Sequence, residues 1–288
     1  MSKNINDLLA IMATLRDPQR GCAWDQAQTY QSIVPYTLEE AYEVADTIER
    51  GAIDELPDEL GDLLFQVVFY SQIGKEQGRF GFDDCVSAIC DKLIRRHPHV
   101  FPDMVAETTA AAPADAASAL KGWEAIKAEE RGEQGQHSVL DNVPGGLPAL
   151  TRAYKLQKRC ASVGFDWPDL TGCWDKVREE MAEVEAEMAA AQQDQAALAE
   201  ELGDLMFALV NVVRKAGFQP ETLLRSANQK FERRFRQVET IMATQAEPVG
   251  VATLAQMDAA WEQGTRYFDT APFYGAGLAE IRLGDALA

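Results

Sequence analysis

An internal repeat constrains the fold of this 288-residue sequence more than any other feature. The clearest pair of segments is DELGDLLF, which begins at position 58, and EELGDLMF, which begins at position 200. Four blocks keep the same order in both halves: 37–46 with 177–186, 58–70 with 200–213, 91–101 with 229–239, and 122–127 with 260–265. Four matched blocks in one order indicate two copies of a single folding unit.

The segments between and after the blocks set the predicted domain limits. Residues 107–120 are rich in alanine, and residues 142–150 contain two prolines and two glycines, so both read as linkers. The sequence therefore predicts four parts: a first copy at 1–127, a linker at 128–148, a second copy at 149–263 and a tail at 264–288.

Both copies are predicted to be helical. Short alternating runs with hairpin turns are nearly absent before the last 25 residues, which argues against a β-sheet. The fold class expected is all-α, with two tandem helical bundles. The amphipathic first 18 residues predict a helix that ends at Asp17-Pro18, with neither a cleavage site nor a membrane-spanning run. We therefore expect a cytoplasmic protein that lies in no membrane.

Charge and cysteine content exclude several classes of protein. The formal net charge of -19 opposes binding to nucleic acid or to anionic membranes, because their phosphates would be repelled. The five cysteines form an odd number with no C-x-x-C pair, which is typical of reduced thiols rather than of a disulfide framework or a zinc site.

Paired carboxylates give each copy a candidate metal site. Side chains three residues apart share a helix face, so Glu180 and Glu183 project together, as do Glu201 and Asp204. Four converging carboxylates without histidine or cysteine suit a hard cation, Mg²⁺ or alternatively Mn²⁺. The first copy repeats the pattern at Glu40, Glu43, Glu59 and Asp62.

Asp204 also raises a question of burial. It precedes a run, Leu205 to Val213, that is apolar almost all round, and such helices are normally buried. We therefore expect a metal to hold a buried Asp204, since an unpartnered buried carboxylate is costly.

The same glutamates allow two alternatives to a metal site. Glutamate-rich helices often present only a solvated face. In the first copy, Thr37 and Glu40 also fit a capping box, in which the glutamate would satisfy a backbone N–H at the start of a helix. The second copy has Val177 in place of Thr37 and keeps its glutamates, which favours the metal interpretation.

A basic face accompanies each carboxylate set. Lys230, Arg233 and Arg234 share one helical face, and their counterparts in the first copy are Lys92, Arg95 and Arg96. Carboxylates that bind a metal, together with guanidinium groups, suit a metal-bound polyphosphate. Salt bridges to other helices are the alternative. The His97-Pro98-His99 segment has no counterpart in the second copy and is not predicted to bind metal.

These motifs resemble a known family. The doubled E-E-x-x-E and E-x-x-D pattern, with GCAWD, RRHPHVF and KFERRFR, is similar to the two-domain MazG nucleoside triphosphate pyrophosphohydrolases, of the all-α NTP pyrophosphatase superfamily. The resemblance implies a homodimer that hydrolyses NTPs to NMP and pyrophosphate with Mg²⁺, chiefly in the second copy. The implied metal ligands are Glu180, Glu183, Glu201 and Asp204. The implied nucleotide contacts are Lys176, Glu179, Glu180, Lys230, Arg233, Arg234 and Trp261.

The expected chemistry leaves one role open. Either Glu179 or Glu180 would orient or deprotonate the attacking water, and spacing does not distinguish them. Lys230 and the two arginines would stabilise the departing pyrophosphate.

The tail departs from the repeat. Trp123 is followed four positions later by Lys127, whereas Trp261 is followed by Thr265. From Gly264 onward the sequence resembles an aldo-keto reductase fragment, in which Asp269 and Tyr274 match that family's catalytic pair. About 25 residues cannot form a barrel of this kind, so we expect no oxidoreductase activity.

Two other functions fit part of the pattern. A ferritin-like di-iron protein also uses carboxylates in a helical bundle, but its Glu-x-x-His pairs are missing from this sequence. A non-catalytic nucleotide-binding or regulatory protein would use the same residues without turnover.

Overall fold

The computed structural model describes residues 3–104, 138–190 and 194–244, with isolated residues at 115, 118, 119, 122, 123, 126, 130, 253, 256, 257 and 261. These residues form helices and turns, and no strand occurs among them, which confirms the predicted all-α class. The chain divides into two compact units, Met1–His137 and Ser138–Ala288, called the first and the second unit below.

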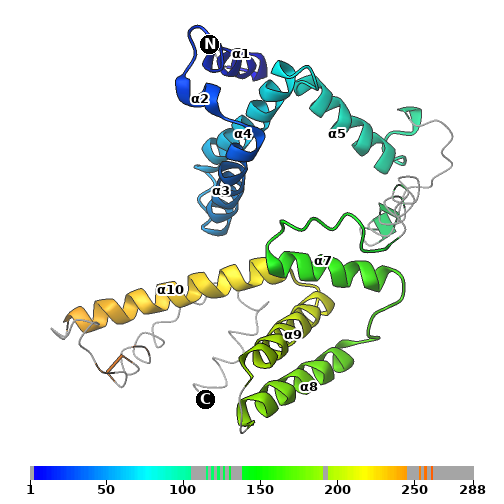
Figure 1. Ribbon diagram of the computed structural model, residues 1–288, viewed down its shortest axis with the longest axis vertical. Coiled ribbons are helices and arrows are strands. Elements are labelled where there is room, and N and C mark those ends of the chain that lie inside the picture. Colours follow the sequence, from blue (N-terminus) through cyan, green and yellow to red (C-terminus); the bar gives the residue numbers. More distant parts are fainter. Residues whose placement is uncertain are drawn as a thin grey trace. The chain divides into compact units, whose positions relative to one another are not determined.

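The first unit is built around a helical hairpin. Its helices are α1 (Ile5–Leu15), α2 (Ala23–Ala27), α3 (Tyr30–Glu49), α4 (Leu56–Glu76) and α5 (Phe82–Arg96), followed by the short 3-10 helix η1 (Pro102–Met104). Helices α3 and α4 pack along each other, and α1 and α5 each contact α4 (Figure 1). Asn4 caps α1, which ends before Asp17-Pro18 as the sequence predicts.

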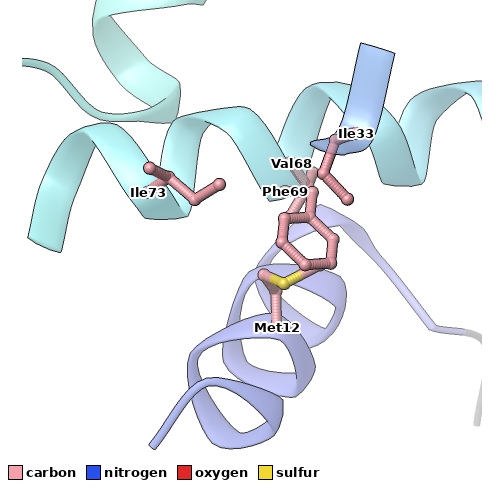
Figure 2. Close-up of a cluster of buried hydrophobic side chains, with 5 residues drawn as sticks. All are labelled: Met12, Ile33, Val68, Phe69 and Ile73. Carbon is pink, nitrogen blue, oxygen red and sulfur yellow. The ribbon is translucent and has the colours of Figure 1, made fainter. Parts of the chain in front are cut away.

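A packed apolar core holds the first unit together. Met12 of α1, Ile33 of α3, and Val68, Phe69 and Ile73 of α4 are buried against one another (Figure 2). Phe69 is fully buried, and the guanidinium of Arg16 lies 5.3 Å from the centre of its ring. Aromatic rings of this size dominate the stability of a small core.

The second unit repeats the hairpin. It contains α7 (Ala149–Ser162), α8 (Leu170–Ala189), α9 (Gln195–Lys215) and α10 (Pro220–Thr244). Asp169 and Asp194 cap α8 and α9 with side-chain oxygens that accept backbone N–H groups. Helix α8 packs along α9, and α7 also packs on α9 (Figure 1). The buried cluster of this hairpin contains Cys173, Val177, Ala208 and Val212.

The predicted alternative of a capping box at Thr37 is wrong. Thr37 lies inside α3, which begins at Tyr30 and is capped by Thr29 and Ser32. The Thr37 hydroxyl donates to the Ile33 carbonyl (3.2 Å) and lies 2.8 Å from the Tyr70 hydroxyl. Because a helix that begins earlier already satisfies the local N–H groups, Glu40 is not needed for capping.

The expectation of a fully buried helix after Asp204 is also wrong. Asp204 itself is exposed, and Met206 is 58% exposed on the same helix. Only alternate positions of the run, Ala208, Val210 and Val212, are buried in this chain. No helix in the described part of the chain combines the length and the apolar character needed to span a membrane.

Candidate active site

Three carboxylates meet between the two helices of the second hairpin. Glu180 and Glu183 come from α8 and Glu201 comes from α9, and one carboxylate oxygen of each lies within 4.8 Å of the others. The i, i+3 spacing on α8 puts the first two on the face that packs against α9. Asp204, one turn after Glu201, lies outside this group of three.

Glu180 is the buried member of the cluster. It is 4% exposed, and its Oε1 lies 2.6 Å from the ammonium group of Lys176. Its Oε2 is also buried and has no hydrogen-bond partner among the described residues. A buried carboxylate oxygen without a partner is costly unless a cation approaches it. The buried carboxylate is therefore Glu180, where the sequence had predicted Asp204.

The pKa of Glu201 is raised above its usual value. Burial is the largest cause, and the negative charges of Glu183, Glu180 and Asp204 add to it. Asp204 thus lies close enough to act on the cluster electrostatically. An oxygen-only donor set with mutual repulsion fits a hard divalent cation such as Mg²⁺ or Mn²⁺, which would neutralise that repulsion.

Lys176 links the two candidate catalytic glutamates. Its Nζ lies 2.7 Å from Glu179 Oε1, in addition to its contact with Glu180. The two glutamates differ in access, because the Glu179 side chain is exposed whereas that of Glu180 is buried. Glu179 therefore faces solvent beside the cluster, and Glu180 lies within it.

The basic residues lie on α10. Arg234 stacks on Trp261, with its Cζ 3.9 Å from the ring centre, and Phe231 lies beside the same ring. Helix α10 packs on α7 and α9, and Figure 1 shows its later part extending away from the α8–α9 hairpin. The structure thus brings Arg234 and Trp261 together. Lys230 and Arg233 lie on the same helix as Arg234.

The first unit has a matching carboxylate cluster. Glu40, Glu43 and Glu59 also bring one oxygen each within 4.8 Å of the others. Glu40 accepts a hydrogen bond from Gln66 Nε2 at 3.4 Å. Its pKa is raised, first by burial and then by the charges of Asp62 and Glu43. The carboxylate pattern of the repeat thus produces the same local geometry twice.

The arginines of the first unit already have an acidic partner. Arg95 and Arg96 lie 2.7 Å and 2.6 Å from the two carboxylate oxygens of Glu130. These hydrogen bonds, that of Arg96 first, lower the pKa of Glu130 to about 2. Lys92 lies on the same helix, α5. The predicted alternative of salt bridges is therefore realised for this arginine pair.

A pocket of about 680 Å³ opens beside the carboxylates of the second unit. Its lining includes Lys176, Glu180 and Asp204, together with residues that the sequence reasoning missed: Gln157, Phe165, Trp167, Phe207, Asn211 and Arg214. The repeat held one signal for this pocket. In the repeat, Asp62 corresponds to Asp204, and seven residues further on Phe69 corresponds to Asn211. Phe69 is buried in the core of the first unit, so a polar asparagine at the corresponding position of the second unit indicates that this position is not simply core.

Lys127, Thr265 and the tail at 264–288, with Asp269 and Tyr274, lie outside the described residues. The same holds for much of the predicted linker at 128–148. The contrast between Lys127 and Thr265 therefore stays a sequence observation.

A duplicated helical hairpin with clustered carboxylates defines an all-α protein with two potential metal sites. The chain belongs to the MazG family: the MazG nucleotide pyrophosphohydrolase domain matches residues 28–101 and 173–239. A nucleoside triphosphate pyrophosphohydrolase of Escherichia coli K12 is 53% identical over 262 residues, covering 91% of this chain and 97% of its relative.

Two further relatives bear on the chain. The nucleoside triphosphate pyrophosphohydrolase/pyrophosphatase MazG of Thermotoga maritima is 37% identical over 257 residues, which cover 89% of this chain and 94% of that protein. A D-threo-aldose 1-dehydrogenase of a Pseudomonas species is 63% identical over only 30 residues, or 10% of this chain and 9% of that enzyme. The family that the motifs resemble is thus confirmed, and the likeness to aldo-keto reductases is confined to a short segment.

Proposed function

We propose that the second unit carries the chemistry of this nucleoside triphosphate pyrophosphohydrolase, converting NTPs to NMP and pyrophosphate. The observation that carries the proposal is the buried Glu180, whose unpartnered oxygen belongs to a cluster of three carboxylates beside a pocket. A divalent cation bound by carboxylate oxygens neutralises the negative charge of a polyphosphate. The carboxylate cluster is therefore the kind of site that a nucleoside triphosphate substrate needs.

Glu180, Glu183 and Glu201 would hold the metal. Asp204, one turn further along α9, would complete the set. When bound, Mg²⁺ supplies Lewis-acid neutralisation of the phosphate charge. Mn²⁺ satisfies the same oxygen donors.

The residues of this chain then divide the remaining work. Glu179 takes the proton of the attacking water, because it is exposed beside the cluster while Glu180 belongs to the metal set. Lys176, held between both glutamates, orients them and offers a positive charge to the phosphates. Lys230, Arg233 and Arg234 stabilise the pyrophosphate that leaves, and Trp261 holds the guanidinium of Arg234 in place.

A homodimer is consistent with the surface of the second hairpin. Trp174 and Met181 of α8 and Leu202 and Leu209 of α9 are large apolar side chains that this chain leaves exposed. An apolar surface of this kind is typical of an interface between copies. Light scattering should give twice the mass of one chain, and a monomer at micromolar concentration would contradict this part of the proposal.

The short segment similar to D-threo-aldose 1-dehydrogenase adds no second activity. A (β/α)₈ barrel needs about 250 residues, and its catalytic groups come from several strands. We therefore expect no change in NADPH absorbance with aldose substrates, and measurable oxidation or reduction would contradict this.

One assay tests the proposed function. The purified protein is incubated with ATP and Mg²⁺, and pyrophosphate and orthophosphate are measured separately. We expect AMP and pyrophosphate as primary products and no turnover in excess chelator. ADP with orthophosphate, or full activity in chelator, would contradict the proposal.

A further inference from the structure

The pocket of the second unit has two chemically different parts. One part contains the groups of the candidate metal site, Glu180 and Asp204, with Lys176. The other part is formed by aromatic and apolar side chains, among them Phe165, Trp167 and Phe207. A ligand that fills both parts must carry negative charge at one end and a flat apolar group at the other.

The two parts are spaced along α9. Asp204 lies near the carboxylate cluster, and Asn211 lies seven residues further along the same helix. At 1.5 Å per residue this separates them by about 10 Å. A phosphate group held at the cluster would therefore leave the rest of a nucleotide directed along α9 toward Asn211.

The aromatic part is built by a fixed loop between α7 and α8. Asp166 pairs with Arg214 and with Lys215 of α9, which ties the loop to the hairpin. The Trp167 ring lies against Gly172, where a Cβ atom would come within 2.7 Å of the ring. Only glycine at this position lets the tryptophan lie so close to α8.

Phe165 is held on that loop with its ring in solvent. It is 81% exposed although it is a large apolar residue, and it lines the pocket. Aromatic rings in this setting are the usual stacking partners of nucleobases, because every base has a flat π-face.

Two amides give the aromatic part its polar groups. Gln157 donates from Nε2 to the Phe207 carbonyl at 2.8 Å, and its buried Oε1 has no hydrogen-bond partner among the described residues. Asn211 Oδ1 accepts hydrogen bonds from Nε and Nη2 of Arg214 (3.0 Å and 2.8 Å). Its Nδ2 donates to Cys173 Sγ over a long distance of 3.8 Å. The edge of a nucleobase offers both hydrogen-bond donors and acceptors, which suits the amide groups of Gln157 and Asn211.

We propose that the aromatic part of this pocket binds the nucleobase of the substrate, with Phe165 and Trp167 as stacking residues and Gln157 and Asn211 facing the base edge. This inference rests on the proposed function, since it places the triphosphate at Glu180. The volume of about 680 Å³ admits purines as well as pyrimidines, and every base offers donors and acceptors on its edge. The pocket therefore binds nucleobases in general and does not discriminate between them.

The first unit provides the variant that tests the proposal. Asn211→Phe places in the pocket the residue that the repeat carries at Phe69. Ala199→Phe adds the same ring at an exposed position of α9 that does not line the pocket, and is the matched control. Phe165→Ala removes an exposed ring without touching the core, so it tests the proposal even if Asn211→Phe does not fold.

The probe is adenosine, which has no phosphate, in the presence of chelator and followed by saturation-transfer NMR. We expect adenine signals with the wild type and with Ala199→Phe, and signals reduced by about tenfold or more with Asn211→Phe and Phe165→Ala. Undiminished signals in both pocket variants, or no signal with the wild type, would overturn the proposal.

One more variant separates this inference from the proposed function. Glu180→Gln should keep the adenosine signal while losing ATP turnover, because the base contacts do not use the metal. Loss of the adenosine signal in folded Glu180→Gln would contradict a separate base pocket. Full turnover by Glu180→Gln would instead contradict the proposed function and leave the adenosine result to decide the base pocket alone.

Discussion

The two hairpins of this chain carry the same carboxylate cluster and differ in what lies beside it. In the first unit, α4 places Phe69 in a packed core with Met12 and Ile33 (Figure 2). In the second unit, the matching position is Asn211, which lines a pocket next to Glu180. One repeat position is therefore core in one unit and pocket wall in the other.

A second difference concerns the positive groups. Glu40 matches Glu180, so Tyr36 stands in the first copy where the second has Lys176. The arginines of the first unit are held by Glu130, whereas the repeat of the second copy ends before the position that would match Glu130. The two clusters therefore share their carboxylates and differ in the groups around them. In the second unit the carboxylates lie beside a pocket and beside Lys176, the features on which our proposal of catalysis there rests.

The largest effect should come from opening the first core. Phe69→Ala removes a fully buried ring and should lower the free energy of unfolding by about 3–5 kcal/mol. Asn211→Ala, the matched change in the second unit, removes a pocket-lining side chain and should cost roughly 1 kcal/mol or less. Urea unfolding of both variants measures the difference. Equal losses would show that Asn211 is also a core residue, which would break the comparison.

A smaller effect should come from metal binding in both units. Burial and then the neighbouring negative charges raise the pKa values of Glu59 and Glu201. If Mg²⁺ binds both clusters it should relieve this repulsion, and at 100 times its Kd a bound ion stabilises a site by about 2.7 kcal/mol. We expect Mg²⁺ to raise the unfolding temperature of the wild type. The shift should shrink in Glu40→Gln and in Glu180→Gln and vanish in the double variant. A double variant with the full shift would show that Mg²⁺ binds elsewhere.

The smallest effect concerns the acidic partner of the first arginine pair. The lowered pKa of Glu130 means that its carboxylate stabilises the folded state above the unfolded pKa of about 4.5, and that this contribution is lost as the pH falls toward 2. Because Arg95 is largely exposed, solvent screening limits the effect to about 1 kcal/mol. Glu130→Gln should unfold at a lower temperature than the wild type at pH 7, and the gap should narrow at pH 3.5. A gap that is constant with pH would contradict an ionic cause.

Much of the fold could be predicted because it follows from local pattern. The repeat and the helical periodicity gave the all-α class, and the motifs gave the family, which the comparisons confirm. Spacing of three residues also placed Glu180 with Glu183, and Glu40 with Glu43, on shared faces. The assignment of these residues to metal, nucleotide and catalysis stays a prediction.

The errors have a common physical cause. Apolar letters after Asp204 predicted burial, but periodicity does not say which faces of a helix another element covers, and α9 leaves Met206 exposed. The pocket depends on a loop fixed by Asp166 and on the approach of Trp167 to Gly172, both of which are tertiary contacts. The ion pairs of Asp166 join residues nearly 50 positions apart, so no short window of the chain contains them. Trp167 and Gly172 are close in sequence, but helical periodicity does not predict how the chain folds back between them.

The most direct test of the central claim compares turnover by two matched variants. Glu180→Gln and Glu40→Gln remove the same carboxylate from the second and the first cluster, and pyrophosphate release from ATP with saturating Mg²⁺ gives kcat for each folded protein. If the second unit carries the chemistry, Glu180→Gln should lower kcat by about 100-fold or more, and Glu40→Gln by less than about threefold. Equal losses, or a larger loss in Glu40→Gln, would contradict the assignment of catalysis to the second unit.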